Sequence, residues 1–454
     1  MLPLLFLLFL FPCLFHIFNC SLILVIETYR HGAREPIRDY WNANEFKSKG
    51  ELTPVGMRQH YILGQLLKTE YIDNLKFLSS TFNETELYVY STNVNRTIMS
   101  ALSQLYGMYP LGSGPQLPNN MNFSLLIPPF NNSYQITADD YSALPNSYQP
   151  IPIHTNRIDQ EYLLRSWDAN VCKINKKWYL EQYNTTFYKE LVNDFHETLM
   201  KVADMVNVPR ETMDMWKLHD IYDVFQNDIY AGKALPQDFE IYHKNMSYLY
   251  DTLVYLVDFG SVKQKRVLST PFFQKVIGLL EAKVSGNENK KWIMYSAHDI
   301  TLVMILAGLN YTSYECVAQG WKQGGNYDKL CQHFPTYASN LLIELHNNSN
   351  TFSVKIRYNG EYLMEYDYHD FISKLKGSVV DDFLNICNDT VKFTLNDKQS
   401  DEGGSMGGWG WFFFGLVIGI AGSVLAAFFL YKKYIRPGRD LLPFTAEMEV
   451  IQNK

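Results

Sequence analysis

A long apolar run that ends abruptly in charged residues constrains this chain more than any other feature. Residues 22–29 read LILVIETY, and Arg30, His31 and Arg34 follow. Such a run, with β-branched members, is typical of a strand buried in a parallel sheet, whose ligands bind at the carboxyl ends of the strands. Arginines grip phosphate oxygens in bidentate fashion, and an imidazole between them can attack phosphorus. The segment therefore predicts a site for a phosphate dianion; the alternative is a basic turn at the surface.

Two further segments show the same succession of strand, loop and helix. One strand is predicted over residues 87–90, and the helix after it carries Arg96 in its first turn. Another strand is predicted over residues 292–297, with His298 and Asp299 at its carboxyl end. Parallel strands end at one edge of a sheet, where helix amino termini add partial positive charge. We therefore expect these residues to meet those of the first strand around one anion.

Helical segments are predicted between these strands. One helix should begin at Pro54, because Thr53 can cap it and proline suits the first helical position. Its apolar face is predicted to carry Ile62, Leu63, Leu66 and Leu67. Residues 111–245 differ in character, since prolines punctuate a polar stretch before helix-like segments at 178–200 and 210–230. We interpret residues 111–245 as a mainly helical insertion that forms the other wall of a cleft.

Composition sets the remaining boundaries of the globular part. We expect an α/β catalytic core over residues 21–110 and 246–395, followed by a flexible stalk over residues 396–408. The formal net charge is −7, and no extended basic stripe precedes the extreme C-terminus. This charge pattern argues against a nucleic-acid partner.

Both ends of the chain carry long apolar stretches. Residues 1–20 are expected to be a signal peptide, with an uncleaved anchor as the alternative. Residues 409–431 carry no charge and, at about 1.5 Å per residue, can cross a hydrocarbon core of about 30 Å. The basic tail over residues 432–454 should then be cytoplasmic, which gives a single-pass type I membrane protein. A buried globular helix is the alternative for residues 409–431.

Exposure to an oxidising compartment should leave traces in the sequence. Four cysteines lie outside the leader, and they could form two disulfides in three pairings or, as the rival explanation, hold zinc: Cys172, Cys316, Cys331 and Cys387. Eight sequons are candidate glycosylation sites, at Asn83, Asn122, Asn131, Asn184, Asn245, Asn310, Asn347 and Asn388. A ninth sequon at Asn95 is expected to stay bare, because a glycan there would collide with the anion site.

Several motifs together resemble the histidine acid phosphatases. Residues 29–36, YRHGAREP, look like that family's RHGxRxP signature. Four other segments resemble family elements, most closely those of the prostatic and lysosomal types: 52–59 (LTPVGMRQ), 91–101 (STNVNRTIMSA), 149–155 (QPIPIHT) and 295–299 (YSAHD). The resemblance covers nearly all of the chain before the stalk. It implies a phosphoglycerate mutase-like, doubly wound sheet with a mainly α-helical insertion, here joined to one C-terminal transmembrane helix.

The resemblance also implies a role for each charged residue. His31 would be the nucleophile that forms a phosphohistidine, and Asp299 would protonate the leaving alkoxide. Four residues would bind the phosphoryl oxygens: Arg30, Arg34, Arg96 and His298. No metal or other cofactor is expected, because the arginines supply the positive charge.

Other features depart from the family pattern or compete with the predicted site. Residues 310–334 form a longer loop than in mammalian-type relatives, and its two cysteines suggest a local Cys316–Cys331 bridge beside a long-range Cys172–Cys387 bridge. The other His-Asp pairs, at residues 219–220 and 369–370, follow no buried apolar strand, so we interpret them as surface or structural pairs. His60 and His154 are likewise predicted to be non-catalytic.

We therefore expect a membrane-anchored acid phosphatase that hydrolyses small phosphate monoesters or phosphoproteins in lysosomes, endosomes or at the cell surface. Gly415 and Gly419 form a small-xxx-small pair that could pack two such chains as a homodimer. Two other functions stay open. One is a non-catalytic surface receptor or adhesion protein on a phosphatase fold, and the other is a mutase-like phosphotransferase.

Overall fold

The computed structural model describes residues 20–37, 49–129, 141–325, 327, 331–349 and 351–388. The predicted stalk, membrane span and cytoplasmic tail lie outside the described residues, as does all of the predicted signal peptide except Cys20, where the first strand begins. Among the helices that the structure describes, none is long and apolar enough to cross a bilayer.

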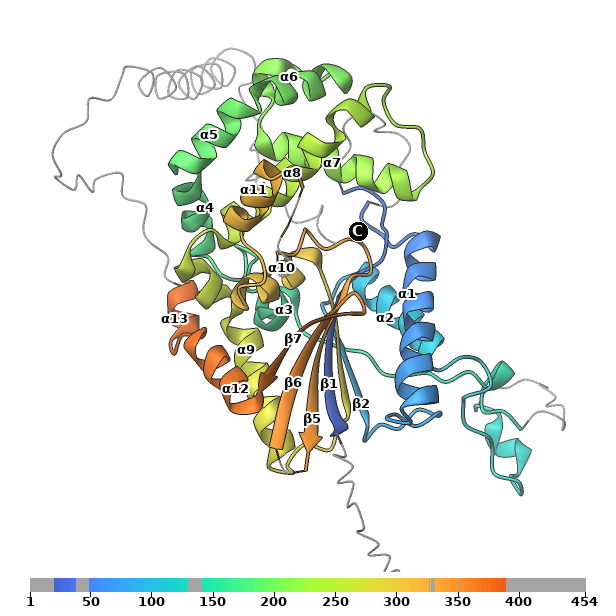
Figure 1. The fold of residues 1–454 in the computed structure, drawn as a ribbon. Coiled ribbons are helices and arrows are strands. Elements are labelled where there is room, and N and C mark those ends of the chain that lie inside the picture. Colours follow the sequence, from blue (N-terminus) through green and yellow to red (C-terminus); the bar gives the residue numbers. More distant parts are fainter. Residues whose placement is uncertain are drawn as a thin grey trace, which may run out of the picture. The chain divides into compact units, whose positions relative to one another are not determined.

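The described residues form one seven-stranded mixed sheet in the order β3-β2-β4-β1-β5-β6-β7 (Figure 1). Its strands are β1 Cys20–Arg30, β2 Leu87–Ser91, β3 His154–Thr155, β4 Trp292–Ala297, β5 Asn340–Asn348, β6 Thr351–Tyr358 and β7 Glu361–Asp367. The strands β3, β2, β4 and β1 run parallel, whereas β5, β6 and β7 pair antiparallel. The prediction of a doubly wound parallel sheet therefore fits only the half of the sheet formed by β3, β2, β4 and β1. Connections of a few residues between β5, β6 and β7 allow only antiparallel pairing, and Asn359 and Gly360 take the positive φ angles of a tight hairpin.

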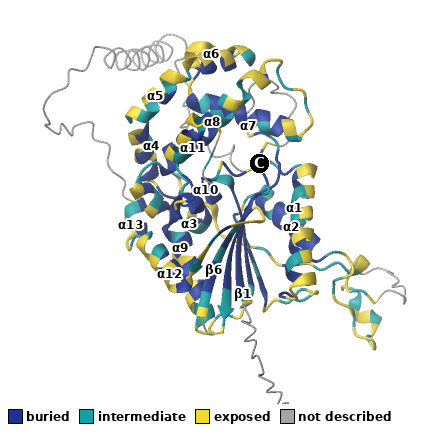
Figure 2. Cartoon of the chain, viewed as in Figure 1, coloured by how far each residue is buried: buried dark blue, intermediate teal, exposed yellow. Residues whose placement is uncertain are grey.

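Helices cover both faces of the sheet. On one face, α1 Pro54–Leu67 and α2 Asn95–Met108 pack on Val25 and Tyr29 of β1. On the other face, α8 Phe239–Phe259, α9 Val262–Val284, α10 Asp299–Gly308 and α12 Tyr368–Gly377 share a core with Leu24 and Ile26. Side chains alternate along a strand, so β1 contributes to both cores and is buried throughout its centre, as its apolar sequence predicts (Figure 2).

The start of α1 is as predicted, but its buried face is not. Thr53 caps the helix by accepting a hydrogen bond from the Gly56 N–H. The predicted apolar face is wrong for two of its four residues, because Ile62 and Leu66 are 46% and 63% exposed, whereas Leu67 is buried and Leu63 packs partly against the core. The face packed on α2 instead carries Gly56, His60, Gly64 and Leu67. The two helices approach so closely that a Cβ on Gly64 would lie 2.0 Å from the Gln104 carbonyl oxygen, which excludes larger side chains.

The helices within residues 111–245 are α3 Tyr162–Arg165, α4 Asn175–Tyr183, α5 Thr186–Asp194, α6 His196–Met205 and α7 Met215–Tyr230, with 3-10 turns η2 Phe123–Leu126, η3 Pro145–Ser147, η4 Ile158–Gln160 and η5 Arg210–Thr212. Of these, the helices α5, α6 and α7 lie over the carboxyl edge of the parallel strands, whereas the teal stretch before residue 150 lies beside α1, away from that edge (Figure 1). The predicted boundary at residue 245 falls inside α8, which runs unbroken from the insertion into the core. The remaining elements are the π-helix η1 Lys68–Asn74, α11 Tyr314–Lys322 and α13 Phe383–Asn388.

Two disulfides join the pairs that the sequence suggested. The Cys172–Cys387 bridge ties the insertion to α13 across 215 residues, and Cys316–Cys331 closes the loop that contains α11. Of the eight candidate glycosylation sites, Asn131 lies outside the described residues, and none of the other seven is buried.

Candidate active site

Three parallel strands end side by side and deliver the predicted residues to one place. Arg30 at the end of β1 is aligned with Ala297 at the end of β4, and Ser91 at the end of β2 with Ser296. His31 follows Arg30, and the His31 and His298 rings lie 5.7 Å apart. The structure thus brings together the strand ends that the sequence predicted to converge.

His31 is held as a neutral imidazole with one ring nitrogen free. Its Nδ1 lies 2.9 Å from the Gly32 carbonyl oxygen, which can only accept, so Nδ1 carries the hydrogen and Nε2 keeps its lone pair. The ring is 2% exposed. Burial, followed by the charges of Arg96 and Arg30, lowers the pKa of His31 well below its usual value. A nucleophilic nitrogen is therefore available even in acid.

Arg30 is fixed on all sides. Its Nη2 lies 2.8 Å from Asp299 Oδ2, and its Nη1 donates to the Pro335 carbonyl oxygen at 2.6 Å. The guanidinium carbon lies 4.0 Å from the centre of the Tyr337 ring. Burial lowers the pKa of Arg30, but Asp299 and Tyr337 outweigh it, so the group stays charged. Such a guanidinium needs no reorganisation to receive a phosphoryl oxygen.

Arg34 is oriented by the insertion. Its Nη2 lies 2.9 Å and 3.0 Å from the two carboxylate oxygens of Asp223 on α7. Asp223 in turn accepts from Asn227, whose Oδ1 accepts the Tyr337 hydroxyl at 2.8 Å. This buried network joins α7 to the segment between α11 and β5 that carries Tyr337, and it sets the direction of the Arg34 guanidinium.

Arg96 differs from the other two arginines because no carboxylate among the described residues pairs with it. Within the described residues, its guanidinium reaches only the Gly50 carbonyl oxygen, at 3.5 Å, and its Nε has no partner, as is also true of Arg30 and Arg34. Burial and the nearby charge of Arg34 lower its pKa to about 10. A partly buried cation without a carboxylate partner is costly, and a bound dianion would offset that cost.

His298 and Asp299 lie where β4 gives way to α10. The His298 Nε2 lies 3.0 Å from the Thr92 hydroxyl, and its ring meets Trp167 edge-on. Burial and the charge of Arg96 lower the pKa of His298 well below its usual value. Asp299 accepts the Ile300 N–H at 2.8 Å. Burial would raise its pKa, but Arg30 and Arg34 hold it below its usual range, so Asp299 is ionised in the unliganded protein.

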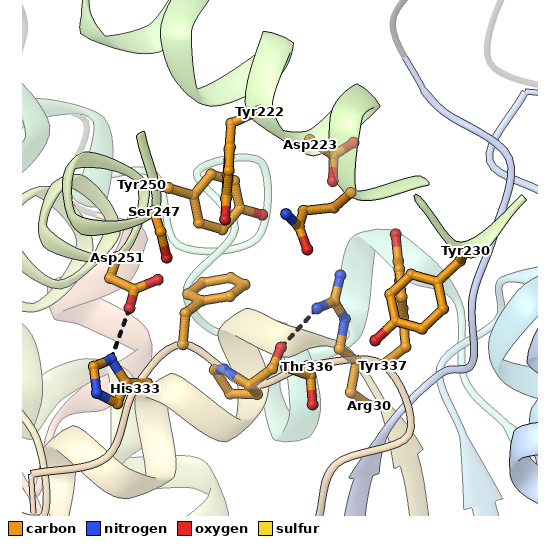
Figure 3. Close-up of a pocket in the computed structure, with 13 residues that line it drawn as sticks. Arg30, Tyr222, Asp223, Tyr230, Ser247, Tyr250, Asp251, His333, Thr336 and Tyr337 are labelled. Atoms are coloured by element: carbon orange, nitrogen blue, oxygen red, sulfur yellow. Dashed lines mark hydrogen bonds and ion pairs between the residues drawn. The ribbon is translucent and has the colours of Figure 1, made fainter. Parts of the chain in front are cut away.

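A cavity of about 180 Å³ opens beside Arg30, between α7, α8 and residues 333–337 (Figure 3). Tyrosines and Phe334 form much of its wall, and carboxylates come from Asp223 and Asp251. At its far end the His333 ring lies 3.2 Å from Asp251 (Figure 3). His31 is not among the residues that line this cavity.

Sequence reasoning missed the residues that orient the predicted ones. Asp223, Asn227 and Tyr337 occupy no motif, and their partners lie more than a hundred residues away in the chain. Thr92 stood inside a quoted motif without a role. No signal in the sequence singles out Asp223, because its neighbours one turn away on α7 are also polar: His219, Asp220, Gln226 and Asn227.

The histidines predicted to be non-catalytic lie in different environments. His154 is exposed and stacks on Tyr88, and His219 stacks on Tyr250 at 4.3 Å. His369 is exposed. His60 is fully buried beneath the strand ends. In the part of the chain that the structure describes, no group of three or more His, Cys, Asp or Glu side chains is arranged to hold a metal ion.

Comparison with known proteins defines the class. A family model described as histidine phosphatase superfamily (branch 2) matches residues 26–359, and the chain belongs to that superfamily. Lysosomal acid phosphatase of Xenopus laevis is 30% identical over 291 residues, which are 61% of this chain and 59% of that relative, less than two thirds of its length. Human prostatic acid phosphatase is 26% identical over 350 residues, 74% of this chain and 77% of that relative. The apo form of Hafnia alvei phytase matches in fold alone, with a TM-score of 0.54 at 11% identity over 81% of this chain and 98% of that one.

Proposed function

We propose that this protein is an acid phosphatase that hydrolyses phosphate monoesters through a phosphohistidine on His31. The observation that carries the proposal is a neutral, buried imidazole whose Nε2 is free, surrounded by the charges of three arginines. The similarity to lysosomal and prostatic acid phosphatases supports it.

In the first step, His31 Nε2 attacks phosphorus and the bond to the leaving oxygen breaks. Arg30, Arg34 and Arg96 stabilise the charge on the phosphoryl oxygens, and His298 adds a further contact. The leaving oxygen takes a proton from Asp299. In the second step, water attacks phosphorus while the Asp299 carboxylate accepts its proton, and the P–N bond breaks to restore neutral His31.

Proton balance explains why acid should favour this reaction. Asp299 is ionised in the unliganded protein, so the proton for the leaving group must arrive with the substrate. A phosphate monoester holds one proton below its second pKa of about 6. That proton can pass to Asp299 as the arginines grip the dianion. Above about pH 6 the substrate lacks it, so the rate should fall for leaving groups that need protonation.

We also propose that the enzyme works in the lysosome or at the cell surface as a single-pass type I membrane protein. Two disulfides, sequon asparagines that are not buried, and a lysosomal relative support an oxidising exoplasmic location. Imaging of a tagged full-length chain, with glycosidase treatment, tests this. Cytosolic signal from an unglycosylated chain would contradict it.

The proposed activity is tested by His31→Ala on p-nitrophenyl phosphate, with His369→Ala as the matched control. Loss of the nucleophile should lower kcat by ~10⁴-fold or more, because no other group can carry the phosphoryl. His369 is exposed at the start of α12, so the His369→Ala variant should keep the wild-type rate. A folded His31→Ala enzyme with more than a trace of activity would refute the assignment. Product analysis with an acceptor alcohol separates hydrolysis from phosphotransfer.

A further inference from the structure

A chain of buried polar groups runs beneath the nucleophile, on the face of the sheet covered by α1 and α2. Glu27 on β1, Gln104 on α2 and His60 on α1 are all fully buried. As placed, Gln104 Nε2 lies 2.8 Å from Glu27 Oε1 and Gln104 Oε1 lies 3.0 Å from His60 Nδ1, although the amide oxygen and nitrogen could be exchanged by a half-turn of the amide. His60 Nε2 lies 3.1 Å from the carbonyl oxygen of Arg30. The chain therefore ends on the residue before His31.

Counting hydrogens along this chain shows that it needs one extra proton. The Arg30 carbonyl only accepts, so His60 Nε2 must carry a hydrogen. If His60 is neutral, its Nδ1 has a lone pair and the Gln104 amide must turn its NH₂ toward it. The amide oxygen then faces Glu27, and that contact requires a protonated carboxyl. If the amide oxygen faces His60 instead, His60 must be a buried imidazolium. Both arrangements hold one proton more than a neutral His60 beside an ionised Glu27.

We infer that Glu27, Gln104 and His60 share this proton, that it resides on Glu27, and that it positions the Arg30–His31 segment for catalysis. Glu27 is a positioning residue, since it touches neither the phosphate nor the reacting atoms. In the resulting chain every donor points the same way, from the Glu27 carboxyl through the amide and the imidazole to the Arg30 carbonyl. The catalytic part of this inference rests on the proposed phosphatase function, whereas the proton itself does not.

Electrostatics favours the carboxyl over the imidazole as the site of the proton. Burial raises the pKa of Glu27 to about 7 even with the Gln104 amide placed to donate to it and with the hydrogen bond from Trp292, and the turned amide removes the first of these two opposing bonds. Burial lowers the pKa of His60 to about 4, in spite of its bonds to Gln104 and Arg30. Between these two values Glu27 is protonated and His60 is neutral.

The groups packed around Glu27 leave this balance undisturbed. The helix α1 presents His60 to Glu27. The strand β1 presents Tyr29, whose pKa is raised well above its usual value by burial and by the charge of Glu27, so Tyr29 stays neutral. The strand β4 presents the neutral Trp292, which donates to Glu27 Oε2 at 3.1 Å. On β5 the neutral Asn340 donates to Glu27, and Glu344 opposite Val25 is already bonded by Tyr71 and Arg357.

Loss of the proton would act directly on the catalytic backbone. If Glu27 were ionised, the Gln104 amide would have to turn its NH₂ group toward the Glu27 carboxylate. The Gln104 amide oxygen would then face the lone pair of His60 Nδ1. His60 would keep its bond to Arg30 only by changing its protonation or its position. The Gly32 N–H, which donates to Ser100 on α2 at 3.1 Å, depends on the same packing of helix against strand. Because the folded pKa of Glu27 is raised, its stabilising contribution is full below about pH 4.5 and is lost as pH rises through about 7.

The proton is tested by infrared difference spectroscopy of the full chain, titrated from roughly pH 5 to roughly pH 9. Wild type minus Glu27→Gln should contain the carbonyl band of a protonated carboxylic acid that disappears with a midpoint near 7. Glu344→Gln is the matched control, because Glu344 lies on the same face of the sheet but its pKa is lowered, so that variant should keep the band. Absence of a titrating band in the wild-type-minus-Gln spectrum would overturn the inference. So would a nitrogen chemical shift of an imidazolium at His60 in the wild-type protein near pH 6.

Positioning is tested by the pH profile of kcat on p-nitrophenyl phosphate, a substrate whose leaving group scarcely needs a proton. Gln at position 27 can donate to the turned Gln104 amide at every pH, so Glu27→Gln should keep acid activity and move the alkaline limb up by roughly one pH unit. Glu27→Leu cannot donate and should lower kcat about tenfold. A Glu27→Gln profile that overlays wild type would refute the positioning role while leaving the phosphatase assignment intact.

Discussion

The two walls of the active site are built on different principles. The sheet wall, at the ends of β1, β2 and β4, holds the residues that we propose to react with or bind the phosphate, each placed next to a strand end by its backbone. The insertion wall, from α7, α8 and residues 333–337, holds groups that orient Arg30 and Arg34 and line the cavity beside Arg30. In the proposed mechanism the chemistry therefore belongs to the sheet wall, and we expect the insertion wall to govern selectivity.

After loss of the nucleophile itself, the largest effect should come from Asp299→Asn, and it should depend on the substrate. An alkyl leaving group of high pKa needs the proton, whereas p-nitrophenolate departs almost unaided. We expect kcat on an alkyl phosphate to fall by ~10³-fold and on p-nitrophenyl phosphate far less. Asp370→Asn, in the exposed His-Asp pair, is the control and should change neither rate. Equal losses on both substrates would move Asp299 from proton donor to phosphate binder.

An intermediate effect is expected from Arg96→Ala, which removes the arginine without a carboxylate partner among the described residues. Its charge should be fully available to the transition state, so kcat/KM should fall by about 10²–10³-fold. Removing a half-buried cation that has no carboxylate partner among the described residues, and whose pKa is lowered by burial, should at the same time raise the melting temperature of the phosphate-free enzyme. Arg58→Ala, on the exposed face of α1, should change neither quantity. A drop in stability together with unchanged kinetics would refute this account of Arg96.

The smallest effect should follow from Asp223→Asn in the insertion wall. The change leaves every sheet-wall group in place but loosens the bidentate hold on Arg34. We expect kcat/KM to fall about tenfold, the worth of one charge-assisted hydrogen bond. Asp220→Asn, one turn away on α7, serves as the comparison and should act like wild type. A loss as large as that of Arg96→Ala would erase the distinction between the two walls.

The sequence predicted the sheet wall well because local signals define it. Adjacent residues define both the strand at residues 292–297 and the N-terminal cap of α1, and both predictions match the structure. The antiparallel half of the sheet and the buried face of α1 were not predicted, since both depend on packing between distant segments. Leu66 is exposed because Gly64 lets α2 approach on another side. Asp223 escaped prediction for the same reason, as its partner lies 189 residues earlier.

The central claim is that His31 carries the phosphoryl group on its free nitrogen, and rapid quenching with mass spectrometry tests it most directly. Wild-type enzyme mixed with p-nitrophenyl phosphate and quenched in alkali, where phosphohistidine survives, should yield a phosphorylated peptide spanning residue 31. Phosphorus NMR of that peptide should place the group on Nε2, because Nδ1 is bonded to the Gly32 carbonyl. A phosphoryl group on another residue, on Nδ1, or on no residue during steady turnover would contradict the account.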